Sequence, residues 1–182
     1  MSPVAHATIA IAAAKLAEPA LQRAGGGARI DYRFAALGAL LPDLLDKPLA
    51  WILFRGYFHD SHLYGHTILF GLTLVVLGLV LAWRGELRLL LLGIGALMHL
   101  PVDPVAHNPS TLLWPLLGTD FDYVTPLVPY SGVVDAAIVV GLAIAYRRSP
   151  VWRERIRRFA FRGELMWDVA ADAGAPAVAG EA

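Results

Sequence analysis

Residues 67–83 have the sequence TILFGLTLVVLGLVLAW, which contains no charged side chain. A helix needs about 17–25 mostly apolar residues to cross the hydrocarbon core of a bilayer. This stretch therefore predicts a membrane-embedded helix. The composition of the 182-residue chain points the same way, because 57% of its residues are hydrophobic and 16% are charged. Soluble domains average about 45–50% apolar and about 25% charged residues.

Further apolar runs lie on both sides of this stretch. Four more segments are predicted to form helices in the membrane: 4–17, 34–54, 89–102 and 132–146. In the second of these, a proline is expected to end the helix near Leu41, so that residues 44–54 form either the other half of a broken helix or an interfacial segment. We predict an all-α, polytopic membrane bundle with about five membrane-embedded helices, contained in a domain of residues 1–146. Residues 104–131 form a proline-rich loop within it, and no cleavable signal peptide is expected.

The character of the chain changes after residue 146. Residues 147–167 carry seven arginines, and Trp152, Ile156 and Phe159 recur among them at helical spacing. This pattern predicts a basic, amphipathic cytoplasmic segment that lies on anionic lipid. A solvated basic tail would have the same composition. Residues 168–182 are rich in Ala, Gly and Pro and are predicted to be disordered.

The basic residues also predict an orientation, since Lys and Arg favour the cytoplasmic side of short loops. If the carboxyl terminus is cytoplasmic, twelve of the fifteen Lys and Arg residues fall on the inner side. The same topology places the ionisable residues of the apolar segments near the extracytoplasmic face. The opposite orientation would also bring them to one level, on the cytoplasmic face.

Six histidines stand out in this apolar chain, because ionisable groups within a membrane are costly and usually functional. His99 and Asp103 are four residues apart and would share one face of a helix. His59, His62 and His66 follow one another at spacings of three and four. The chain has no cysteine, so a metal would be bound by nitrogen and oxygen atoms, which are the usual ligands of catalytic zinc.

The predicted topology brings ligand-type residues from distant segments to one depth. We predict that five of them bind a divalent metal, with zinc favoured: His6, Asp43, His66, His99 and Asp103. Asp46 and His62 are predicted to act as general base or acid. Whether His59, His107 and Asp135 join the site is left open. Taken singly, these residues also have simpler interpretations, such as interfacial polar groups, helix caps or exposed loop residues.

The order of these residues resembles the YdjM-like family of inner-membrane metal-dependent hydrolases. The resemblance rests on His6, Leu-Leu-Pro-Asp at 40–43 with a second acid at Asp46, Gly-His-Thr at 65–67, His-x-x-x-Asp at 99–103 and Leu-Leu-Trp-Pro-Leu at 112–116. It covers roughly residues 4–117 and, more loosely, the final apolar segment. A more distant likeness of motif and fold connects the chain with the all-helical zinc-dependent phospholipase C.

The family resemblance implies metal-dependent hydrolysis, and the likeness to phospholipase C implies a phosphoester. We therefore expect a membrane-bound, metal-dependent hydrolase that cleaves a phosphoester of a lipid or lipid-like substrate with a metal-bound hydroxide. The alternative is a non-enzymatic membrane protein, either a metal transporter or a structural protein with a metal-stabilised helix bundle. Nucleic acid is not expected as a partner, because the net charge is zero. The sequence leaves the oligomeric state open.

Overall fold

The computed structural model of the protein describes residues 2–55, 57–58, 61–118, 121 and 131–165. Within this part of the chain every regular element is helical, apart from one isolated bridge between Arg55 and Phe58. The all-α prediction is therefore confirmed. The segment 168–182, predicted to be disordered, lies outside the described residues.

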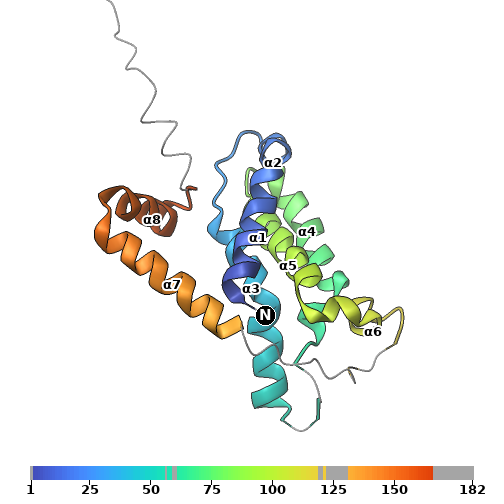
Figure 1. Cartoon of the computed structure of the whole chain (residues 1–182). Helices are drawn as coiled ribbons and strands as arrows, with labels where there is room; N and C mark the ends of the chain where they lie inside the picture. The colour runs from blue at the N-terminus through green and yellow to red at the C-terminus, as the bar shows by residue number, and fades with distance from the viewer. Residues whose placement is uncertain (1, 56, 59–60, 119–120, 122–130, 166–182) are drawn as a thin grey trace, which may run out of the picture.

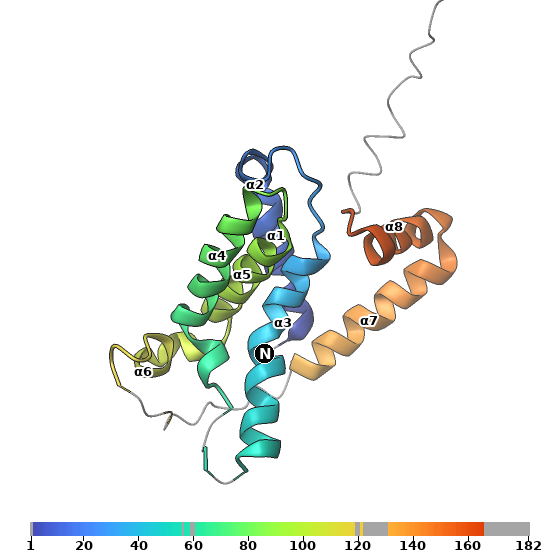
Figure 2. The same ribbon diagram turned by 180° about the vertical axis from the view of Figure 1, so that it is seen from behind.

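The body of the molecule is a bundle of four helices: α1 (Pro3–Leu16), α3 (Arg33–Pro48), α4 (Ile68–Ala82) and α5 (Arg88–His99). Figures 1 and 2 show them side by side, and α5 contacts each of the other three. Small residues make this close packing possible. A methyl group added to Gly38 would overlap the backbone carbonyl of Leu92, and one added to Gly95 would overlap that of Ala35. Helices of membrane proteins commonly use such small residues where their backbones meet.

The first helix ends near the position at which the sequence predicted it to stop. A second short helix, α2 (Glu18–Ala24), begins at once and is bent by 65° from α1. Pro19 fits the first turn of α2, where a missing backbone N–H breaks no helical hydrogen bond. Among the described helices, none is by itself both long and apolar enough to cross a membrane, although α1 and α2 together meet that length and composition. The number of membrane-embedded helices therefore stays a prediction.

The third helix differs from the prediction that it ends near Leu41. It continues through the buried Pro42 to Pro48, and the π-helical turn η1 (Leu49–Leu53) follows directly. A proline inside a helix removes one backbone hydrogen bond, but α3 packs along the whole of α5, and this contact holds the helix together. As a result Asp43 and Asp46 lie three residues apart on one continuous helix and share a face.

The last two helices, α7 (Ser131–Arg148) and α8 (Pro150–Arg162), form an arm that diverges from the bundle and returns to it at the end of α8 (Figures 1 and 2). There Arg29 donates a hydrogen bond to the carbonyl of Arg162 at 2.7 Å, and Arg33 donates one to the carbonyl of Ala160 at 2.8 Å. Carbonyls at the end of a helix lack partners within it and attract positive charge. The two arginines therefore fasten α8 to the bundle.

The predicted apolar segment 132–146 of this arm is helical, although α7 extends to Arg148. Of the described part of the basic segment 147–167, the helical residues are 147–148 and those of α8. The amphipathic spacing within 147–167 is realised in α8, whose residues Trp152, Ile156 and Phe159 are partly buried. The contact of this segment with anionic lipid and the division of the chain at residues 146 and 167 stay predictions.

Candidate metal centre

Six ionisable side chains from four separate segments converge at one end of the bundle. They form three overlapping groups, in each of which one ligand atom per residue lies within 4.8 Å of the others: His6, His99 and Asp103; Asp43, His66 and His99; and His62, His66 and Asp103. All are buried except Asp43, which is partly buried. The structure thus brings together all five predicted metal ligands, and adds His62 to them.

Local structure explains how each segment delivers its ligand. His66 ends the short 3-10 turn η2 (Tyr64–His66), and Thr67 then caps α4 by accepting a hydrogen bond from the Phe70 backbone N–H at 3.0 Å. His99 is the last residue of α5, and the turn η3 (Leu100–Val102) leads to Asp103. The Asp103 carboxylate in turn accepts from the Val105 N–H at 3.1 Å and caps the next turn, η4 (Pro104–His107).

The ring nitrogens of the histidines face one another and the two carboxylates. The Nε2 atoms of His66 and His99 are 3.2 Å apart, and Nε2 of His62 lies 3.1 Å from Oδ1 of Asp103. The Nε2 atoms of His6 and His99 are each 3.8 Å from Oδ2 of Asp103. On the other side of the cluster, Nε2 of His66 is 3.5 Å from Oδ1 of Asp43. Such spacing places the lone pairs of several nitrogen and oxygen atoms around one small volume.

Hydrogen bonds on the far side of three rings set which nitrogen faces this volume. The Nδ1 atom of His6 lies 2.8 Å from the carbonyl of Ser2, and that of His99 lies 2.6 Å from the carbonyl of Ala39. A carbonyl only accepts, so both Nδ1 atoms carry the proton and both Nε2 atoms of the neutral rings keep a free lone pair. Metal-binding histidines are commonly oriented by partners of this kind.

Asp46 orients the third ring, that of His66, whereas the sequence predicted that it acts as general base or acid. Its carboxylate is fully buried and lies 2.7 Å from Nδ1 of His66. It also accepts hydrogen bonds from the backbone N–H groups of Leu63 at 2.7 Å, Gly65 at 2.9 Å and His66 at 3.2 Å. The carboxylate is thus engaged on all sides, and its geometry favours a positioning role over the predicted role of general base or acid.

Gly65 belongs to this arrangement because a side chain there would not fit. A Cβ atom at this position would lie 3.0 Å from Cα of Pro42 and 3.1 Å from Oδ1 of Asp46. The glycine therefore lets the turn approach α3 closely enough for the backbone of residues 63–66 to bond Asp46. The glycine of the Gly-His-Thr sequence at 65–67 is visible in the sequence, but its partner Asp46 lies 20 residues before His66 and cannot be recognised from the motif.

The remaining candidates lie in three different places. His59 lies outside the described residues. His107 is exposed on η4, and none of the three groups includes it. Asp135 on α7 accepts a hydrogen bond from the Ser2 hydroxyl, and Ser2 supports His6 through its carbonyl. Asp135 is therefore connected to the cluster through Ser2.

The electrostatics of the cluster favour an ionised carboxylate. Burial alone would raise the pKa of Asp103, but the hydrogen bonds from His62 and from the Val105 backbone lower it to about 2. For His66, burial lowers the pKa, yet the hydrogen bonds with Asp43 and Asp46 outweigh this effect and raise it. Asp103 thus offers a negative charge at neutral pH to a cation or to a protonated imidazole.

The surroundings of one buried nitrogen, Nε2 of His6, indicate whether a metal ion fits this cluster. Nε2 of His6, on a side chain that is 2% exposed, has no hydrogen-bond partner among the described residues. An unpaired buried polar atom costs about 1–3 kcal/mol, and coordination of an ion would remove that cost. The donor set of four imidazoles and two carboxylates suits zinc, iron or manganese. The residues therefore fit a divalent ion.

The fold and the cluster together define an all-helical protein with a buried site that suits a metal ion. Residues 1–167 match the family described as YdjM inner membrane protein. The chain belongs to this family, which confirms the resemblance seen in the sequence and supports a location in the membrane. No curated protein and no solved structure shows significant similarity to the chain. The likeness to phospholipase C therefore rests on the motifs alone.

Proposed function

We propose that the protein is a membrane-bound, metal-dependent hydrolase that acts on a phosphoester of a lipid or lipid-like substrate. The observation that supports it most is the convergence of four imidazole Nε2 atoms and two carboxylates from four segments. Three of the four rings have a fixed partner at Nδ1. Burying and ordering ionisable side chains in this way lowers the stability of the fold, and such a cost is typical of sites that serve binding or catalysis.

His6, Asp43, His66, His99 and Asp103 would hold one or more divalent ions, with zinc as the favoured metal. Such an ion, when bound, supplies positive charge for an anionic transition state and lowers the pKa of a water molecule. Asp46 holds His66 in place and keeps its Nδ1 engaged. Burial of the cluster excludes bulk water, which strengthens every charge interaction within it.

His62 is the residue best placed to move a proton. It is the most exposed of the four histidines, at 8%, and it hydrogen-bonds the ionised Asp103. A carboxylate next to an imidazole stabilises the protonated ring and fixes its orientation. In this proposal His62 exchanges protons with the substrate or with solvent, as general acid or base.

The proposal keeps the orientation predicted by the arginines, with α8 in the cytoplasm and the metal centre near the extracytoplasmic headgroups. The distribution of positive charge between the two ends of the bundle agrees with this orientation. Arg29, Arg33 and Arg88 lie at the end where α8 is fastened, and the cluster lies at the other end. A substrate with its phosphoester at headgroup level would reach the cluster without leaving the bilayer.

The non-enzymatic alternatives make different demands. Transport needs ligands at more than one depth, whereas in the described part of the chain every group of three ligands belongs to this one cluster. A structural metal would tie the same segments together without turnover. Measurement of metal content and of hydrolysis on the same samples separates the two.

The test uses the full chain purified in gentle detergent. We expect bound metal by elemental analysis and release of phosphate or of a phosphorylated headgroup from a panel of lipid phosphoesters. His99→Ala and Asp103→Ala should lose both. His107→Ala, which changes an exposed histidine outside the cluster, is the matched control and should lose neither. Metal binding without hydrolysis across the panel would support the structural alternative, and protein that remains metal-free after zinc addition would refute the site.

A further inference from the structure

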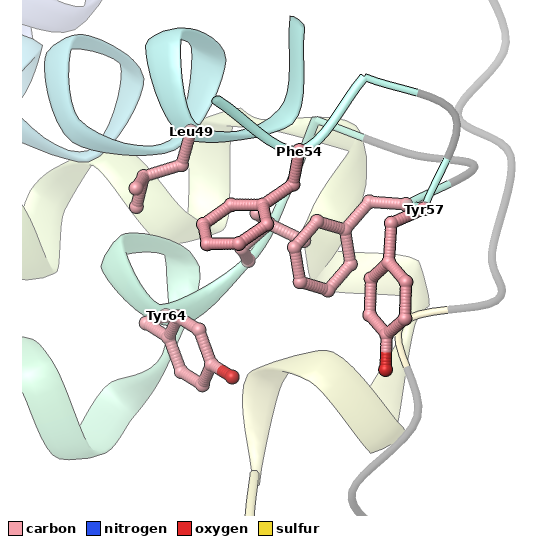
Figure 3. Close-up of a pocket in the computed structure, with 6 residues that line it drawn as sticks. Leu49, Phe54, Tyr57 and Tyr64 are labelled. Atoms are coloured by element: carbon pink, nitrogen blue, oxygen red, sulfur yellow. The ribbon is translucent and has the colours of Figure 1, made fainter. Parts of the chain in front are cut away.

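An apolar cavity of about 430 Å³ lies beside the metal centre. Six residues line it, and none is charged: Leu49, Phe54, Tyr57, Phe58, Leu63 and Tyr64. Figure 3 shows the rings of Phe54, Tyr57 and Tyr64 turned toward one another around this space, with Leu49 on the α3 side. Its volume is within the range of about 300–1,000 Å³ that is typical of small-molecule sites.

The cavity and the metal centre share one piece of chain. Leu63 lines the cavity, and its neighbour His62 belongs to the cluster. The backbone N–H of Leu63 donates to Asp46, the same carboxylate that positions His66. The cavity and the cluster are therefore lined by adjacent residues of the same turn.

The walls of the cavity are braced by ring contacts. Phe58 meets Phe54 and Tyr57 edge to face, with ring centroids 5.9 and 5.0 Å apart. Tyr64 in turn contacts Trp114 at 5.2 Å. Edge-to-face contacts stabilise such arrangements, so the cavity has a formed shape and its surface suits hydrocarbon.

The residues that directly precede Phe54 in the chain are apolar and exposed. Trp51, Ile52 and Leu53 of η1 precede the lining residue Phe54 and are 61%, 77% and 68% exposed. Contiguous exposed apolar side chains mark a surface that binds a partner or a membrane. In a protein of an inner-membrane family the hydrocarbon of the bilayer is the partner that fits, and it would place acyl chains at the mouth of the cavity.

We infer that this cavity binds a hydrocarbon chain of the lipid whose phosphoester reaches the metal centre. Binding of the phosphoester end of the lipid at the metal centre rests on the proposed function. Binding of its hydrocarbon chain rests on the cavity itself. It narrows the substrate class to amphiphiles with a long apolar chain next to the phosphate. Water-soluble phosphoesters would lack the contacts with Phe54, Tyr57 and Tyr64.

The first experiment measures binding of alkylphosphonates, which cannot be hydrolysed at the C–P bond, to the zinc-loaded full chain in phosphatidylcholine nanodiscs. The affinities of wild type, Phe54→Asp and Phe161→Asp for ethylphosphonate and decylphosphonate are compared. Each buried methylene group is worth up to about fourfold in affinity. We expect Phe54→Asp to weaken the binding of decylphosphonate by about tenfold or more and that of ethylphosphonate hardly at all. Phe161→Asp, which changes a 77% exposed phenylalanine on α8 that does not line the cavity, should change neither affinity.

The second experiment needs no metal and so separates the two proposals. Palmitic acid with a diazirine on its chain is photolysed in the same nanodiscs after zinc has been removed, and labelled peptides are mapped. Labelling should concentrate on residues 49–64 and fall in Phe54→Asp but not in Phe161→Asp. Labelling spread evenly over the apolar helices would overturn the chain site. Concentrated labelling combined with no phosphonate binding would leave the chain site standing and count against the metal centre.

Discussion

At the scale of single residues, two side chains that touch the cluster from outside set its geometry. Asp46 joins α3 to the turn that carries His66 through its carboxyl group, on a side chain that is 0% exposed. Ser2 links the first helix to Asp135 and supports His6. The sequence identified the ligand types because histidine and aspartate are rare in apolar segments. It did not reveal the role of Asp46, because that role depends on backbone N–H groups 17–20 residues away.

Asp46→Asn tests this positioning role. The amide keeps the size of the side chain but has one oxygen in place of two, so at least one of the N–H groups now bonded to the carboxylate loses its partner. We expect metal affinity to fall by about 10–100-fold, measured by competition with a zinc-binding dye. The free energy of unfolding should also fall by about 1–3 kcal/mol. Unchanged affinity in a folded variant would mean that His66 needs no such support.

His6→Leu tests the unpaired nitrogen. In the wild type, zinc should raise the melting temperature, because a ligand that binds only the folded state stabilises it. The variant lacks one of the proposed ligands and removes a buried unpaired atom, so the zinc-dependent increase should shrink. The free energy of unfolding without metal should change little, because removal of the unpaired Nε2 offsets the loss of the hydrogen bond from Nδ1 to the Ser2 carbonyl. Thermal unfolding with and without a chelator measures both, and an equal zinc effect in both proteins would exclude His6 as a ligand.

At the scale of elements, the packing of α5 against α3 fixes the distance between the ligands that the two helices carry. The apolar runs predicted helices close to those observed, because their composition leaves few other structures. The prediction that the helix ends near Leu41 was wrong, because α3 continues through Pro42 although a proline disfavours this. The contact with α5 that compensates joins residues far apart in the chain, Gly38 with Leu92 and Ala35 with Gly95.

Gly95→Ala probes this contact. The added methyl group would press against the Ala35 carbonyl and force the two helices apart. Overpacking of this kind typically costs about 1–3 kcal/mol, and it should also weaken metal binding, since His99 and Asp43 would separate. Gly141→Ala on α7, where a Cβ atom would meet nothing within 4 Å, is the matched control. Equal stability of the two variants in a chemical unfolding experiment would contradict the close packing.

At the scale of the whole molecule, the arm of α7 and α8 is held at both ends. Asp135 meets Ser2 near the metal centre, and the carbonyls at the end of α8 bond Arg29 and Arg33 at the opposite end of the bundle. Gly163, with φ of +70°, adds a carbonyl that accepts from the Tyr32 N–H at 3.2 Å. The sequence predicted both helices but not these attachments, which join residues more than 120 positions apart.

Arg29→Ala combined with Arg33→Ala should release α8. Hydrogen exchange of the amides in residues 153–162 should become faster, because the helix loses the partners of its terminal carbonyls and its contact with the bundle. Metal content should stay unchanged, since the cluster lies at the other end. Arg84→Ala, in the turn after α4, serves as the control for the loss of positive charge. Unchanged exchange in α8 would show that other contacts hold the arm.

The origin of the six clustered side chains in four segments has a consequence for the biogenesis of the protein. The first lies at position 6 and the last at position 103, so the ribosome must complete more than half of the chain before the whole set exists. Until then the earlier imidazoles and acids lack their later partners. Under the proposed function, the full set of metal ligands is therefore available only after all four segments have been made, and a cell short of the metal would accumulate a chain whose site is empty.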